Sequence, residues 1–319
     1  MKKALKIIGI ILLTIVVVGL IGYIYINSSD IPKYKTLHIN YTVKSDSRSV
    51  ARGKKLVLML CANCHINHET GKLTGVKMLD APAEFGDIYS QNITDDKNYG
   101  IGKWTDGELL YLLRTGIKNN GQYAPPYMVK LPTMADEDIN AIISFLRSDD
   151  PLVIADPTPD IPTNPSFLTK LLCRVAWKPF PLPEKRIILP DSTNTIALGK
   201  YLAANLDCFS CHSADFKTNN FLQPELSAGY FGGGNKPLDR EGRVKPTPNL
   251  TLDKETGIGN WSKEQFIRAV RFGIKDGENA LTYPMTPYNQ LTETEINAIY
   301  QYLKTIPPIK NKVQRSIYE

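Results

Sequence analysis

The feature that most constrains this chain is a short motif that occurs twice. The spacing Cys-x-x-Cys-His is found at Cys61-Ala-Asn-Cys64-His65 and at Cys208-Phe-Ser-Cys211-His212. In this motif both thiols bond covalently to haem, and the histidine supplies one axial ligand to the iron. Zinc half-sites and redox thiol pairs also use Cys-x-x-Cys, but neither accounts for a histidine that follows both copies. The motifs therefore predict two covalently bound haem c groups.

Both motifs belong to an internal repeat. The stretch 92–104 aligns with 249–261 at an offset of 157 residues, and both copies contain Asn-x-Thr and Gly-Ile-Gly-x-Trp. The haem motifs themselves are 147 residues apart, so the second copy has ten extra residues, which we expect in a loop around 232–234. Two copies of about 110 residues predict tandem domains rather than a solenoid.

Hydrophobic periodicity predicts an all-α fold for each copy. We expect a helix before each haem motif and another at the end of each copy, at 49–60, 194–206, 136–147 and 293–304. A further helix should follow each of the two repeated tryptophans, Trp104 and Trp261, beginning with capping boxes at Thr105 and Ser262 and ending near Gly116 and Gly273.

The caps of the two final helices should differ. Thr292 and Glu295 form a capping box at the start of the last helix. Ala135 occupies the equivalent position in the first copy and has no side chain that could accept a hydrogen bond. We therefore expect a weaker start for the helix at 136–147.

The beginning of the chain predicts a membrane anchor. Twenty residues without charge run from Ile7 to Ile26, after Lys2, Lys3 and Lys6. A helix of this length matches the roughly 30 Å hydrocarbon layer of a bilayer. The lysines favour a cytoplasmic N-terminus, so one pass through the inner membrane would put the haem motifs on the periplasmic side. A cleaved signal peptide is the alternative, although residues 23–30 contain no small-x-small cleavage site.

These features divide the chain into segments. We expect an anchor at 1–27, a juxtamembrane linker at 28–47, a first haem domain at 48–150, a proline-rich linker at 151–190, a second haem domain at 191–310 and a tail at 311–319. Inside the proline-rich linker, residues 167–177 are apolar enough for a short helix. Cys173 lies there, and we expect a buried small side chain rather than a redox thiol.

The histidines and methionines supply candidate iron ligands. His65 and His212 are expected on one side of each iron. Met128 and Met285 share the offset of 157 and lie in proline-rich loops, which predicts that their sulfurs occupy the other axial positions. Met134 is the main alternative to Met128, although its position before a helix favours the core. His68 could in principle bind iron, but a surface position suits it better.

Two further repeated positions could serve the haem sites. Trp104 and Trp261 are equivalent, and their indole N–H groups could contact haem propionates or the rings could simply pack in the core. Asn92 and Asn249 begin the Asn-x-Thr segments and are expected to form turns.

With these motifs the chain resembles the membrane-associated multihaem cytochrome c subunits of bacterial alcohol, aldehyde and gluconate dehydrogenases. The resemblance rests on Cys-x-x-Cys-His, Asn-[Ile/Leu]-Thr-x-Asp, Gly-Ile-Gly-x-Trp and the methionine-bearing proline loops, and it covers about residues 48–306. It implies tandem cytochrome c-type domains in which the axial roles fall on His65, Met128, His212 and Met285. It also implies electron transfer from a dehydrogenase toward quinone or a terminal oxidase.

The chain is thus predicted to be a membrane-anchored dihaem electron carrier and not an enzyme. It would move one electron at a time in a respiratory chain, alone or as the electron-transfer subunit of a dehydrogenase or oxidase complex. Its partners would be the membrane and redox proteins, namely a dehydrogenase, a quinol-oxidising complex or a terminal oxidase. The net charge of +6 is too small to suggest nucleic acid. A dihaem cytochrome c peroxidase is the alternative, and it would require an iron with an open axial site.

Overall fold

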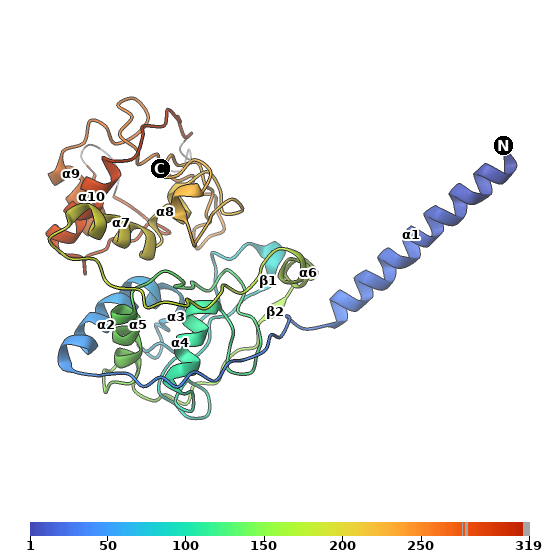
Figure 1. Cartoon of the computed structure of the whole chain (residues 1–319), viewed down its shortest axis with the longest axis horizontal. Coiled ribbons are helices and arrows are strands. Elements are labelled where there is room, and N and C mark those ends of the chain that lie inside the picture. Colours follow the sequence, from blue (N-terminus) through green and yellow to red (C-terminus); the bar gives the residue numbers. More distant parts are fainter. Residues whose placement is uncertain (276, 278–279, 315–319) are drawn as a thin grey trace.

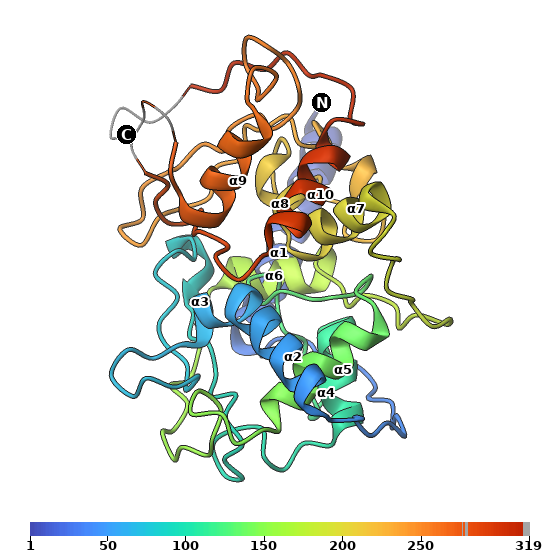
Figure 2. The same cartoon turned by 90° about the vertical axis from the view of Figure 1, so that its left-hand side faces the viewer.

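The computed structural model describes residues 1–275, 277 and 280–314, and the described chain is mainly helical. Two lobes lie side by side, and one long helix projects away from them (Figure 1). Seen along that helix, the lobe with α2 to α5 lies below the lobe with α7 to α10 (Figure 2). We call these lobes the first half and the second half. The prediction of an all-α fold is confirmed.

The projecting helix is α1, which spans Lys2–Ser28. It is long and apolar enough to cross a membrane, and none of its most apolar stretch is buried against the protein. Its end is held by α6 (Phe167–Val175), because Arg174 donates to the Asp30 carbonyl at 2.7 Å and Lys170 donates to the Asn27 carbonyl at 2.7 Å. Helix α1 is therefore attached to the proline-rich segment of the chain.

The two halves contain equivalent helices in the same order. The first half consists of α2 (Ser47–Leu60), α3 (Ala62–His65), η1 (Ala83–Phe85), β1 (Gly86–Asp87), α4 (Asp106–Thr115) and α5 (Asp136–Leu146). The second half consists of α7 (Thr195–Asn205), α8 (Cys208–His212), η2 (Pro224–Leu226), α9 (Lys263–Phe272) and α10 (Glu293–Leu303). Within the described residues the sheet is one short antiparallel pair, in which β1 pairs with β2 (Asn164–Pro165).

Each half is built on a close helix crossing that depends on one glycine. Gly53 of α2 lies so near α5 that an added Cβ would be 1.9 Å from the Ala141 carbonyl oxygen. Gly199 of α7 has the same relation, also 1.9 Å, to the Ala298 carbonyl oxygen of α10. A side chain at either position would force the helices apart, so the glycines allow the first and last helices of each half to share a core.

The predicted helix caps are present. Thr105 and Ser262 form capping boxes at the starts of α4 and α9. Both helices end at glycines in the left-handed conformation, Gly116 with φ 81° and Gly273 with φ 71°. Thr292 caps α10, whereas Ala135 makes no side-chain cap for α5. These local predictions are confirmed.

The proline-rich segment lies against the first half. β2 pairs with β1, and the Phe180 N–H donates to the Thr115 carbonyl at 3.1 Å. Helix α6 forms where the apolar stretch predicted it, with Ser166 as its N-cap. Cys173 is fully buried in a small apolar cluster with Ile31 and Tyr123, which confirms that it packs in a core.

The extra residues of the second half form a loop after α8. In this loop the Gly234 N–H donates to the Thr247 carbonyl at 2.9 Å, and the Asn235 amide donates to the Ser210 carbonyl at 2.7 Å. The loop is thereby fastened beside the second haem motif. The expected tail begins at residue 311, and its part from residue 315 onward lies outside the described residues.

Candidate functional site

The haem motifs lie at the two shortest α-helices of the described residues, directly after the first helix of each half. Cys61 is the C-cap residue of α2, and α3 then carries Cys64 and His65. Helix α8 carries Cys208, Cys211 and His212 in one continuous turn. A helical turn brings the first and fourth residues to one face, so each motif presents its two thiols and its imidazole together.

The four motif thiols are unbridged and half-buried. All five cysteines of the chain are free, so neither motif is a disulfide. Burial raises the pKa of the Cys61 and Cys208 thiols to about 12. Within the described residues no group of three or more His, Cys, Asp or Glu side chains is arranged to hold a metal ion.

Both motif histidines are held by a backbone carbonyl. The Nδ1 atom of His65 is 2.7 Å from the Gln91 carbonyl oxygen, and the Nδ1 atom of His212 is 3.0 Å from the Pro248 carbonyl oxygen. A carbonyl only accepts, so Nδ1 carries the proton and Nε2 keeps its lone pair. Burial lowers the pKa of both imidazoles. Each histidine is therefore neutral and oriented, as an iron ligand must be.

These two carbonyls are positioned by the Asn-x-Thr segments that follow them. The Asn92 side chain accepts from the Thr94 N–H at 2.9 Å, and the Asn249 side chain accepts from the Thr251 N–H at 2.9 Å. Both turns predicted from the sequence are thus present. The same amides also donate onward to the chain that follows each half, from Asn92 to the Asp156 carbonyl at 3.0 Å and from Asn249 to the Ile309 carbonyl at 2.6 Å.

In each half a glycine also helps to hold the motif histidine in place, and the sequence analysis did not identify this glycine. The Gly75 N–H donates to the His65 carbonyl at 2.9 Å, and the Gly233 N–H donates to the His212 carbonyl at 2.8 Å. Both glycines have positive φ, 85° and 72°. An added Cβ would lie 2.3 Å from the Ser90 oxygen at Gly75 and 2.5 Å from the Pro248 carbonyl carbon at Gly233. The two glycines make equivalent hydrogen bonds, but the sequence repeat does not align them, since their separation of 158 residues differs from both repeat offsets.

The Gly-Ile-Gly-x-Trp segment packs on the back of the Asn-x-Thr turn. An added Cβ at Gly100 would lie 2.2 Å from the Thr94 carbonyl oxygen, and at Gly257 it would lie 2.2 Å from the Thr251 carbonyl oxygen. The motif is glycine-rich because two backbones touch there. Trp104 and Trp261 are half-buried and pack against the main apolar core.

The candidate methionine ligands occupy matching places. Met128 and Met285 each lie in a bend at the end of a proline-containing turn, and both are half-buried. Met134 is 1% exposed and belongs to the main core, and His68 is exposed, so both adopt the positions expected of residues without an iron ligand role.

The donor set of each half is the one that haem c requires. Two neighbouring thiols suit the two vinyl groups, and a neutral histidine held through Nδ1 suits one axial position. The residues that could hold the group are Cys61, Cys64 and His65 in the first half and Cys208, Cys211 and His212 in the second half.

Comparison with known proteins supports this chemistry. The family model described as Cytochrome c matches residues 50–149 and 196–307, which contain one haem motif each. The chain is 28% identical over 275 residues to the fructose dehydrogenase cytochrome subunit of Gluconobacter japonicus, with 81% of this chain and 53% of that protein covered. It is 29% identical over 285 residues to the cytochrome c subunit of a quinone alcohol dehydrogenase from Gluconacetobacter polyoxogenes, with 84% and 58% covered.

A third relative is matched over more of its own length. The diheme cytochrome c-type protein of Cereibacter sphaeroides is 26% identical over 265 residues, which cover 78% of this chain and 83% of that protein. The chain spans about half the length of the two dehydrogenase subunits above. Two matched segments, each with its attachment motif and supported histidine, show that this chain belongs to the cytochrome c family.

Proposed function

We propose that this chain is a membrane-anchored electron carrier with two covalently attached haem c groups. The observation that carries the proposal is the duplication of one complete site. Each half has two free thiols on one helical turn and a neutral histidine held by a backbone carbonyl. When bound, haem iron accepts and releases one electron at a time, and the protein adjusts its potential.

The residue roles follow the repeat. Cys61 and Cys64 would bind one haem through thioether bonds, with His65 as axial ligand and Met128 as the opposite ligand. In the second half the same roles would fall on Cys208, Cys211, His212 and Met285. A soft thioether sulfur favours the reduced iron and raises the potential. Trp104 and Trp261 lie beside the cores of the two halves and would be the candidates for propionate contacts.

The anchor and the relatives suggest where the electrons travel. Helix α1 would cross the inner membrane once, with the lysines at its start in the cytoplasm and both halves in the periplasm. Two relatives are named as cytochrome subunits of dehydrogenases. We therefore propose a membrane-bound dehydrogenase as the electron donor, in a chain that ends at quinone or a terminal oxidase.

The test is to produce the full chain with haem maturation, purify it in detergent and record oxidised and reduced visible spectra with the haem-to-protein ratio. We expect two covalent haems per chain, both low-spin and both with the weak red band of methionine-bound ferric iron. Neither haem should react with hydrogen peroxide. A high-spin haem that turns over peroxide would contradict the proposal and support a peroxidase instead. Co-purification of a dehydrogenase from the native membrane would test the partner.

A further inference from the structure

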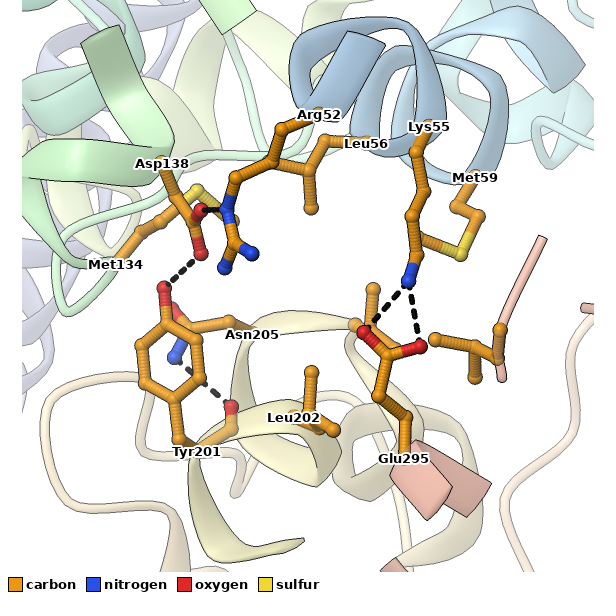
Figure 3. A pocket seen from close by; sticks show the side chains of 12 residues that line it. Arg52, Lys55, Leu56, Met59, Met134, Asp138, Tyr201, Leu202, Asn205 and Glu295 are labelled. Carbon is orange, nitrogen blue, oxygen red and sulfur yellow. Dashed lines mark hydrogen bonds and ion pairs between the residues drawn. The ribbon is translucent and has the colours of Figure 1, made fainter. Parts of the chain in front are cut away.

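The two halves meet across a junction made of equivalent helices. Helices α2 and α5 of the first half face α7 and α10 of the second half around a small cavity (Figure 3). Lys55 of α2 forms an ion pair with Glu295 of α10. On the other side, the Tyr201 hydroxyl of α7 donates to Asp138 of α5 at 2.6 Å. Both contacts join one half to the other.

The two contacts join the same pair of equivalent positions, with the two halves interchanged. The close glycines Gly53 and Gly199 set an offset of 146 between α2 and α7, which makes Lys55 equivalent to Tyr201. The repeat offset of 157 makes Asp138 equivalent to Glu295. The first position of each half therefore bonds to the second position of the other half. This is the pattern of a twofold symmetric dimer interface, here between two halves of one chain.

The apolar part of the junction follows the same symmetry. Leu56 and Leu202 are equivalent and line the same cavity, and so do Met134 and Leu291. All four side chains are at most 7% exposed. A buried and symmetric apolar centre with polar contacts on both sides indicates an interface that is formed permanently.

The junction also connects the two candidate haem sites. The Asn63 amide, inside the first haem motif, is 3.2 Å from the hydroxyl of Thr286, which directly follows Met285. Val129 directly follows Met128, and it lines a second pocket together with Phe209, which lies inside the second haem motif. Val129 and Thr286 are equivalent at the offset of 157. Each methionine loop therefore lies against the haem motif of the other half.

We propose that this junction is the route by which an electron passes between the two haems, and that Lys55, Glu295, Tyr201 and Asp138 are positioning residues that hold it closed. The inference rests on the proposed function. With a haem held at His65 and another at His212, the transfer would oxidise one iron by one electron and reduce the other by one electron. No bond or proton changes. The packed and reciprocal contacts would let this occur without rearrangement of the halves.

The buried polar contacts indicate which residues hold the junction. The Asp138 side chain is 2% exposed and accepts from Arg52 as well as from Tyr201. The Tyr201 hydroxyl also accepts from the Ala135 N–H at 3.0 Å. Loss of this hydroxyl would leave a buried carboxylate and a buried N–H with one partner fewer, which destabilises the closed junction more than loss of an exposed pair would.

The test uses the double variant Glu295→Gln with Tyr201→Phe in the full haem-loaded chain. Glutamine keeps the capping box of α10, because Gln265 fills the same position in α9, but it removes the ion pair with Lys55. Phenylalanine keeps the ring and removes both hydroxyl contacts. The matched control is Glu255→Gln, which breaks an exposed pair with Lys310 away from the junction.

Three measurements decide the matter: intramolecular electron transfer after flash reduction, the potentials of both haems, and thermal unfolding followed by circular dichroism. We expect the double variant to transfer electrons between its haems several-fold more slowly and to unfold in two separate steps, while the control behaves like the wild type. Separate unfolding with an unchanged transfer rate would overturn the route. An unchanged unfolding profile would overturn the positioning role. Failure of the proposed function would show earlier, as missing or high-spin haem in the wild type.

Discussion

The two halves have equivalent candidate sites, but different chain segments pack over them. In the first half, Thr115 and Ile117 at the end of α4 are at most 5% exposed. Their equivalents in the second half, Phe272 and Ile274, are 52% and 51% exposed. Helices α4 and α9 begin with the same kind of capping box and end at equivalent glycines, so the difference comes from the chain segments that pack over them.

The segments that cover the first half are the stretch directly after α1 and the proline-rich segment. The Tyr34 N–H donates to the Gly121 carbonyl at 2.8 Å, and the Tyr123 N–H donates to the Pro32 carbonyl at 3.0 Å. The proline-rich segment adds Phe180 and the buried Cys173. The repeat therefore defines each candidate haem site, whereas the connecting segments decide which half is tied to α1 and which is left open.

A second difference is one residue long. Gly53 lies eight positions before Cys61, whereas Gly199 lies nine positions before Cys208. The extra residue is Asp207, which adopts a left-handed conformation with φ 61°. The second haem motif is thus reached through a sharp local turn, and the first through a nearly continuous helix. The following experiments test whether substitutions at equivalent residues of the two halves have equal effects.

The largest effect is expected from removing one pair of thiols. Cys61→Ala with Cys64→Ala should halve the covalent haem per chain, because each pair would bind its own haem. Cys208→Ala with Cys211→Ala should give the same loss from the other half. The haem-to-protein ratio of denatured protein measures this. A full complement of haem in either variant would contradict the assigned attachment sites.

The methionines should separate the two haems by potential. Met128→Ala should lower the potential of the first haem by a sizeable part of the about 0.8 V that axial ligands span, because thioether sulfur favours ferrous iron. The second haem should stay near its original value, and Met285→Ala should have the opposite pattern. Spectroelectrochemical titration measures both. If both potentials are unmoved in the Met128 variant, this residue is not a ligand.

The two helix crossings that depend on Gly53 and Gly199 should be equally sensitive to an added methyl group. Gly53→Ala and Gly199→Ala each place a methyl group 1.9 Å from a carbonyl oxygen, so each should lower the free energy of unfolding by about 3 kcal/mol. Lys200→Ala, on the exposed side of α7, should change it by less than about 0.5 kcal/mol. Urea denaturation gives these values. A harmless Gly199 variant beside a damaging Gly53 variant would show that the halves differ in their cores.

The smallest effect is expected from Asp207, the one extra residue between α7 and the second haem motif. Burial raises the pKa of Asp207 to about 7, above the value of about 3.9 in an unfolded chain. The folded state therefore binds the proton more tightly, and the stability due to this group is present below pH 4 and lost as the pH rises through 7. Asparagine tolerates the left-handed conformation. Asp207→Asn should therefore gain on the order of 1–3 kcal/mol over the wild type between pH 4 and pH 8. Parallel stability curves would refute the effect.

Local features were well predicted because their causes are local. Capping boxes at Thr105, Ser262 and Thr292 depend on hydrogen bonds between residues three apart, and the missing cap at Ala135 follows from one side chain. The haem motifs are equally local, since two thiols and an imidazole must fit on one helical turn. The long apolar helix α1 could be predicted from length and hydropathy alone.

The supports of the histidines could be predicted only in part. Asn92 and Asn249 were recognised as turn residues, but the carbonyls of Gln91 and Pro248 carry no signature, because every residue has a carbonyl. The roles of Gly75 and Gly233 depend on a second chain segment that approaches each of them.

By itself the sequence determined the cofactor chemistry, the duplication, the helices and the long apolar helix at the start, because each depends on neighbouring residues or on a repeated pattern. The tertiary structure alone decided that the proline-rich segment covers the first half and that Lys55 meets Glu295, 240 positions away. It also decided that Tyr201 takes the place of a lysine in the matching contact with Asp138. Such contacts depend on how two finished surfaces pack, and residues far apart in the chain carry no local signal of their future neighbours.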